Sequence, residues 1–241
     1  RRALRLRTDF PEARSNLAFV LLQAGRLAEG WAEHEHRWRA APWKHLVRRF
    51  ERPEWDGGPL DGRTVLLPAE QGLGDAIQFC RYAPMVEALG GQAVLEMPAP
   101  LLRLAATLPG APTVVRRGDP LPAFDLHCPL MGMPHRLGDA AMNVAVPYLR
   151  ADPAAVAAWR TRLATLPPGP RVGLAWAGDP RMAADRRRSL PAGALAPLAG
   201  AGRFVSLQKG PAPPPGLDVL RHLLCELGLE LAAAKTRVVD L

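Results

Sequence analysis

The sequence predicts an α/β protein in which a helical hairpin precedes two units of alternating strands and helices. Apolar residues recur at helical spacing through residues 12–41, short β-branched runs alternate with helical segments from residue 63 onward, and a proline-rich stretch at 167–170 precedes a new apolar run. Strands that alternate with helices of this length are typical of parallel sheets covered by helices on both faces. We therefore divide the chain into residues 1–42, 43–62, 63–150 and 151–241.

The first 42 residues predict two helices joined at Gly25. Leu17 and Leu21 lie on one face of the first helix, and Trp31 and Trp38 lie on one face of the second. Two such helices cannot bury both of their faces by themselves. We therefore expect further helices to stack on them, as part of a longer array.

Residues 43–62 are predicted to be a linker with turns. Pro53, Gly57-Gly58-Pro59 and Asp61-Gly62 interrupt any regular pattern there. We expect Trp43 and Trp55 to pack this linker against the rest of the protein.

The glycine turn Gly72-Leu73-Gly74 is the stretch best suited to a ligand. A buried strand, Thr64–Leu67, precedes it, and a predicted helix begins near Asp75 and continues to about residue 90. The first amides of a helix lack partners within it and attract negative charge, and glycine lets a ligand approach the backbone. The alternative is a tight turn whose helix is capped by Asp75.

A dinucleotide site is a second alternative for this turn. Such sites have the pattern G-x-G-x-x-G and an acidic residue after the second strand. Gly72, Gly74 and Glu96 fit, but Ile77 stands at the third glycine. Asp75 would also place a carboxylate against the pyrophosphate, so the residues match this pattern only in part.

Further strands and helices follow in alternation. The predicted elements are the strand Gln92–Glu96, the helix Leu101–Leu108, and the strands Thr113–Val115 and Phe124–Cys128. Open α/β sheets bind ligands beyond the carboxyl ends of their strands. His127, near the end of the last strand, is therefore a candidate binding residue, whereas its neighbour Cys128 faces the other side of the strand.

The last 91 residues predict a second α/β unit. Its predicted elements are the helix Ala154–Leu166, the strand Arg171–Trp176, the helix Pro191–Leu198 and the strand Phe204–Leu207. Arg186 to Ser189 and Lys209 would meet near the carboxyl ends of these strands, which suits a phosphate group. A solvated arginine run is the alternative.

The formal charge of +8 resides largely in the first 52 residues, which carry 12 Lys and Arg against 6 Asp and Glu, while the rest of the chain carries 19 against 17. No alternation of aromatic and basic residues accompanies this charge, so we expect no nucleic-acid partner.

No apolar run reaches the length of a membrane span. Three widely spaced cysteines predict a reducing, cytoplasmic location without a disulfide framework or zinc cluster. His34 and His36, two apart on a helix, predict no metal site.

Several motifs carry a family resemblance. The hairpin pattern resembles a tetratricopeptide repeat, and the remainder resembles bacterial tetratricopeptide-repeat proteins with a glycosyltransferase-like module similar to the heptosyltransferase group. The motifs are Asn16-Leu17-Ala18-x-x-Leu21-x-x-x-Gly25-Arg26-x-x-Glu29-Gly30, residues 69–84, His127-Cys128-Pro129-Leu130, Gly173-Leu174-Ala175-Trp176-Ala177-Gly178, Arg188-Ser189 and Leu207-Gln208-Lys209-Gly210. They lie between residue 12 and about residue 210.

The resemblance implies a GT-B architecture of two Rossmann-like lobes and the transfer of a sugar from a nucleotide-diphosphate sugar to an acceptor hydroxyl. It implies that Asp75 is the catalytic base and that acceptor binding involves Gln71, Gly72, Gly74, Gln78 and His127. Arg188, Ser189 and Lys209 would bind the donor phosphates. No metal and no cofactor beyond the nucleotide-sugar substrate is implied.

The second lobe departs from this pattern after Lys209. No segment matches the end of the donor site in the family, and residues 217–235 predict one helix with a leucine-rich stripe instead. We therefore expect the second lobe to be incomplete. We also expect this chain to be inactive by itself and to self-associate. The alternative function is an interaction scaffold whose repeat helices bind a protein or peptide partner without catalysis.

Overall fold

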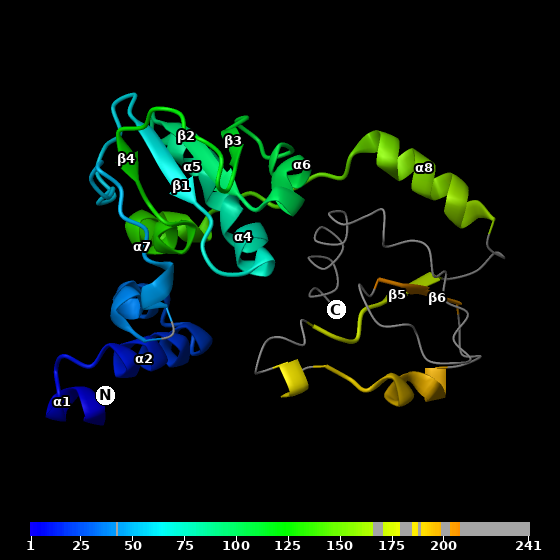
Figure 1. Cartoon of the computed structure of the whole chain (residues 1–241), viewed down its shortest axis with the longest axis horizontal. Coiled ribbons are helices and arrows are strands. Elements are labelled where there is room, and N and C mark those ends of the chain that lie inside the picture. Colours follow the sequence, from blue (N-terminus) through cyan, green and yellow to red (C-terminus); the bar gives the residue numbers. More distant parts are fainter. Residues whose placement is uncertain (42, 166–170, 179–184, 188, 199–202, 208–241) are drawn as a thin grey trace. The chain divides into compact units, whose positions relative to one another are not determined.

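A computed structural model describes residues 1–241 except 42, 166–170, 179–184, 188, 199–202 and 208–241 (Figure 1). The chain forms two compact units, Arg1–Arg150 and Ala151–Leu241. Within the described residues, no helix combines the length and apolar character needed to cross a membrane. The helix predicted at residues 217–235 lies outside the described residues, as do Arg188 and Lys209.

Helices pack together at the start of unit 1, as the sequence predicts. They are α1 (Arg2–Leu6), α2 (Pro11–Gln23), α3 (Leu27–His34) and the 3₁₀ helices η1 (Glu35–Arg39) and η2 (Lys44–Leu46). Gly25, at φ +73°, forms the turn between α2 and α3. The predicted second helix changes to 3₁₀ geometry after His34, whose carbonyl accepts a hydrogen bond from the Arg37 side chain.

A four-stranded parallel sheet forms the centre of unit 1 and confirms the predicted α/β class. Its strands are β1 (Thr64–Pro68), β2 (Gln92–Met97), β3 (Thr113–Arg116) and β4 (Leu126–His127), in the order β3-β2-β1-β4. This arrangement is Rossmann-like. The chain builds outward from β1 to β3 and then returns to the other side of β1, so the direction of winding reverses between β1 and β4.

The helix predicted from Asp75 to residue 90 is divided into three segments. They are α4 (Leu73–Phe79), the 3₁₀ helix η3 (Cys80–Tyr82) and α5 (Ala83–Ala88). Pro84 explains the division because it has no N–H to donate to the Cys80 carbonyl four residues earlier. The helix predicted at Leu101–Leu108 is likewise shorter: η4 (Ala99–Leu101) leads into α6 (Leu102–Ala105).

Residues 43–62 pack against the sheet within unit 1. The backbone N–H of His127 donates to Pro53 O over 3.1 Å, and Trp55 N–H donates to His127 O over 2.8 Å. Glu54 thereby forms a parallel bridge beside β4. Trp55 and Leu60 are fully buried, so this segment belongs to the core of the unit.

The rest of unit 1 closes the sheet with η5 (Leu130–Gly132), α7 (Met133–Leu137) and η6 (Gly138–Met142). Helix α7 contacts α3. The side chain of Arg136, on α7, forms ion pairs with Glu35 and Glu54, each at 2.7 Å. The N-terminal helices are therefore joined to the sheet region by partly buried contacts.

Unit 2 contains α8 (Pro153–Ala164), β5 (Arg171–Leu174), η7 (Asp185–Arg187), η8 (Ala192–Leu198) and β6 (Arg203–Ser206). Asp152 caps α8, because its side chain accepts the Ala154 N–H over 2.8 Å. The strands β5 and β6 pair in parallel. Trp176 and Leu195 form a small buried cluster beside them.

Candidate functional site

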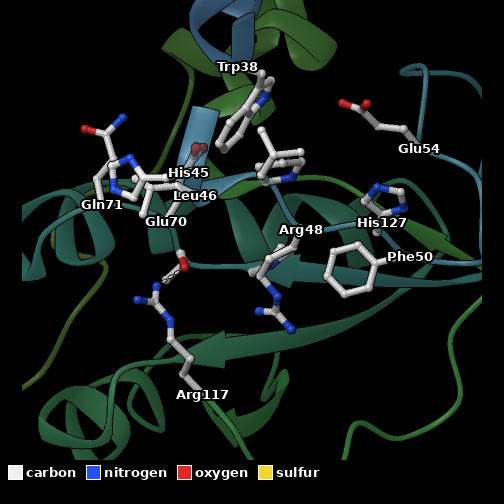
Figure 2. A pocket seen from close by; sticks show the side chains of 14 residues that line it. Trp38, His45, Leu46, Arg48, Phe50, Glu54, Glu70, Gln71, Arg117 and His127 are labelled. Atoms are coloured by element: carbon white, nitrogen blue, oxygen red, sulfur yellow. Dashed lines mark hydrogen bonds between the residues drawn. The ribbon is translucent and has the colours of Figure 1, made fainter. Parts of the chain in front are cut away.

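A cavity of about 430 Å³ lies at the carboxyl edge of the unit 1 sheet (Figure 2). It is beside the ends of β1 and β4, where the direction of winding reverses, and this is where open α/β sheets bind ligands. Its wall combines the helices, residues 45–54 and the sheet edge. The lining residues are Trp38, His45, Leu46, Val47, Arg48, Phe50, Glu54, Pro68, Ala69, Glu70, Gln71, Arg117, His127 and Pro129.

His127 lies in the cavity wall beside Phe50. Their ring centroids are 4.7 Å apart (Figure 2). The Nδ1 atom is buried and has no hydrogen-bond partner among the described residues. The backbone bonds to Pro53 and Trp55 hold this residue in place, so its ring is a fixed part of the cavity wall.

Glu96, at the end of β2, is 1% exposed and forms an ion pair with Arg48. Its Oε1 atom has no hydrogen-bond partner in the described part of the chain. The Arg48 guanidinium also lies over the Phe50 ring, 4.9 Å from its centroid. A buried, arginine-paired carboxylate cannot reach the ribose of a dinucleotide, which argues against the dinucleotide interpretation of this sheet.

Arg117 follows β3 and reaches across the sheet edge to donate a hydrogen bond to the Ala69 carbonyl (Figure 2). Its own backbone N–H donates to Met97 O over 2.8 Å. No carboxylate pairs with its guanidinium among the described residues. Arg117 therefore adds an uncompensated positive charge to the cavity wall.

A buried ion pair fixes the helical side of the wall. Arg37, 1% exposed, donates to both oxygens of Glu70 at 3.2 and 2.8 Å. Glu70 also accepts the Met131 N–H over 3.0 Å. Burial raises the pKa of Glu70, and the adjacent Arg37 opposes this rise. The Arg37 guanidinium lies 4.2 Å from the centroid of the Trp38 ring, which lines the cavity.

The predicted base, Asp75, caps helix α4. Its Oδ2 atom accepts the Gly72 N–H over 3.0 Å, which is the carboxylate half of a capping box. Gln71, at φ +48°, turns the chain between the cavity wall and this cap. The structure thus shows the capping contact that the sequence offered as one alternative.

The predicted acceptor residues fall into two groups. Gln71 and His127 line the cavity. Gly72, Gly74, Gln78 and Asp75 lie on the adjoining turn and helix α4 and are not among the lining residues. Of the predicted donor residues, Ser189 is described in unit 2, where its Oγ atom accepts the Gly178 N–H over 2.9 Å. Arg188 and Lys209 lie outside the described residues.

Neither described cysteine is suited to nucleophilic chemistry. Cys80 and Cys128 are free and buried. Burial raises the pKa of the Cys80 thiol to about 12 and raises that of Cys128 as well. The described residues also contain no group of three or more His, Cys, Asp and Glu side chains that could hold a metal ion.

Sequence reasoning missed most of the cavity wall. The sequence predicts only a helical face for Trp38 and a linker for Arg48 and Phe50, whereas all three line the cavity. Arg117 had a usable signal, because it stands two residues after a predicted strand and hence at the carboxyl edge of the sheet. Nothing in the sequence brings Arg48 to Glu96, since 48 positions separate them.

Comparison with known proteins identifies a distant relative. Protein FlbA of Caulobacter vibrioides is 31% identical over 194 residues, in an alignment that covers 66% of this chain and 30% of FlbA. The chain thus spans about a third of the length of that relative. No protein-family profile matches the chain, and no solved structure matches it.

Proposed function

We propose that this chain is a glycosyltransferase-like module that uses a nucleotide-diphosphate sugar as donor and a hydroxyl group as acceptor. The observation that carries the proposal is the cavity at the carboxyl edge of the Rossmann-like sheet, next to helix α4, which bears Asp75. A GT-B pairing of two lobes, with unit 1 binding the acceptor and unit 2 the donor, belongs to the same proposal.

In this proposal the acceptor occupies the cavity and extends past Gln71 toward Asp75. One carboxylate oxygen of Asp75 is held by the Gly72 N–H, and the other takes the proton from the acceptor hydroxyl. The acceptor oxygen forms a bond to the anomeric carbon while the bond to the diphosphate breaks. Ser189, together with Arg188 and Lys209, binds the departing diphosphate.

No step of this reaction uses a metal, and the free thiols of Cys80 and Cys128 suit the reducing cytoplasm, where we place the activity. The tetratricopeptide-like character of α2 and α3 adds a second role to the proposal, the recruitment of a protein or peptide acceptor. The packing of α3 on α7 supports this, because it joins the helices to the sheet region beside the cavity.

Because we expect this chain to be inactive by itself, the proposal is tested in a complete homologue that carries the same motifs, by measuring release of nucleoside diphosphate from a panel of nucleotide sugars, with and without simple sugar acceptors. Asp75→Asn keeps an oxygen that can accept the Gly72 N–H and so preserves the helix cap, but it cannot take the proton. We expect a loss of about 10²–10⁴-fold in turnover. Asp139→Asn, on η6 and outside the cavity lining, is the matched control.

Two results would contradict the catalytic proposal. The first is turnover by Asp75→Asn at the rate of the unsubstituted homologue, with an unchanged melting temperature. The second is the absence, in that homologue, of any nucleoside diphosphate release and of any rise in melting temperature with nucleotide sugars.

An interaction scaffold is a second candidate, supported by two exposed apolar residues on α2. Phe19 is 52% exposed and Val20 is 62% exposed. Apolar side chains on one helix suit contact with a peptide, a protein or a second copy of this chain. Replacing both with serine should abolish such contacts, measured by light scattering and by binding to candidate peptides, and leave any nucleotide-sugar response unchanged.

A further inference from the structure

The charges around the unit 1 cavity can be counted pair by pair. The charged or titratable lining residues are His45, Arg48, Glu54, Glu70, Arg117 and His127. Glu54 is paired with Arg136 at 2.7 Å, Glu70 with Arg37 at 2.8 Å, and Arg48 with the buried Glu96. Among the described residues, these pairs leave Arg117 as the arginine of the wall without a carboxylate partner.

The position of Arg117 is fixed although its charge is not compensated. Its bond to the Ala69 carbonyl uses part of one edge of the guanidinium, and the remaining N–H groups can bind an anion. Figure 2 shows the guanidinium groups of Arg117 and Arg48 at one end of the cavity, with the Phe50 and His127 rings beside Arg48. Glu96, the carboxylate partner of Arg48, is 1% exposed. It therefore presents no negative charge at the cavity surface that would repel an anion.

The cavity also has an apolar side. Phe50 and Trp38 contribute aromatic rings, and Leu46, Val47 and Pro68 contribute aliphatic surface. Its volume of about 430 Å³ lies within the usual range for small-molecule sites. Aromatic rings beside polar groups suit the C–H face of a sugar ring, while a fixed guanidinium suits a carboxylate or phosphate.

We propose that Arg117 forms a subsite for an acidic group, so that the cavity selects a sugar bearing a carboxylate or phosphate over the corresponding neutral sugar. This inference rests on the proposed function in assigning the cavity to the acceptor. It adds that the acceptor bound there is a sugar, the ionic class of that sugar and the residue that recognises it. The single uncompensated positive charge matches a single acidic group.

The test measures binding of four probes to the 241-residue chain by calorimetry: glucuronate, glucose 6-phosphate, glucose and inorganic phosphate. We expect both acidic sugars to bind more tightly than glucose and than phosphate alone. Arg117→Met should weaken acidic-sugar binding about ten-fold, the loss of one hydrogen-bonded charge, and Arg117→Lys should restore part of it. Carboxylate and phosphate sources are distinguished by which acidic sugar binds better.

Arg116→Gln is the matched control, because Arg116 is the preceding residue, carries the same charge and pairs with Asp119 outside the cavity lining at 2.7 Å. It should bind the acidic sugars as the unsubstituted chain does. Melting temperatures of the variants establish that each is folded.

Each contrary result has its own meaning. If glucose binds as tightly as glucuronate and Arg117→Met binds both equally, the acidic subsite is refuted while the sugar site remains. Inorganic phosphate binding as tightly as glucose 6-phosphate would show a simple anion site and refute sugar recognition in this cavity. If no probe binds, both this inference and the assignment of the acceptor to this cavity fail.

Discussion

The buried imidazole of His34 predicts that unit 1 loses stability in mild acid. His34 is 2% exposed, and its ring packs edge-on against Trp31 with 5.3 Å between centroids. Burial, with a contribution from the charge of Arg37, lowers the pKa of His34 from 6.5 to about 3. The Nδ1 atom has no hydrogen-bond partner among the described residues, so no hydrogen bond to this atom stabilises a charged ring.

The sign and size of the effect follow from proton linkage. Below pH 6.5 the unfolded chain protonates His34 while the folded chain does not, so the unfolded state binds more protons. Stability from this group is complete above pH 6.5 and falls by about 1.4 kcal/mol per pH unit as the pH decreases toward 3. At pH 5 the loss is therefore about 2 kcal/mol.

The substitution His34→Phe isolates this effect because phenylalanine keeps the ring packing and cannot titrate. The free energy of unfolding is measured by urea denaturation followed by tryptophan fluorescence. Between pH 7 and pH 5, we expect the unsubstituted chain to lose about 2 kcal/mol more than the variant. Trp31→Phe is the control: it alters the same packing and should retain the original pH dependence. Equal pH dependence of His34→Phe and the unsubstituted chain would refute the reasoning.

Two further predictions concern buried contacts of the helices. Arg37→Met leaves Glu70 and Glu35 without their shared partner and should lower the free energy of unfolding by about 3–5 kcal/mol. The double variant Arg37→Met with Glu70→Leu should recover part of this loss. Chemical denaturation measures both variants, and an unchanged free energy of unfolding for Arg37→Met would contradict the ion pair. Gly30→Ala should destabilise unit 1 although alanine favours helices, because the new Cβ would lie 2.7 Å from Leu22 side-chain atoms. The Cβ of Gly74→Ala would meet nothing within 4 Å, so this variant should stabilise α4 by up to about 1 kcal/mol. A higher melting temperature for Gly30→Ala than for Gly74→Ala would contradict close packing of Leu22 on Gly30.

Local patterns in the sequence were sufficient for the element types between Thr64 and His127, whereas η2, η5, α7 and η6 were not predicted. The apolar run at Thr64–Pro68, the glycine turn after it and the alternation that follows all correspond to elements of the parallel sheet. These patterns act over a few residues, so a strand or helix can be predicted from its own sequence. Element lengths were less predictable, because Pro84 and the Arg37 side chain end α-helical geometry earlier than apolar spacing indicates.

The candidate site was only partly accessible to the same reasoning. The carboxyl edge of the sheet pointed to His127, since a ligand site there follows from parallel strand order, whereas Gln71 was predicted from the family resemblance. The capping contact of Asp75 agrees with the turn-and-cap alternative, and the Asp75→Asn assay tests whether the same carboxylate also serves as a base.

By itself, the sequence determined that this is an α/β protein with packed N-terminal helices, a parallel sheet and a glycine turn at its carboxyl edge. Only the tertiary structure decided that residues 43–62 pack on the sheet, that Trp38 joins the cavity wall, and that Glu96 is covered by Arg48 while Arg117 keeps an uncompensated charge. The physical reason is sequence separation. Periodicity reports which face of an element is buried, whereas ion pairs and cavity walls depend on which distant side chains the packed backbone brings within a few ångströms of each other.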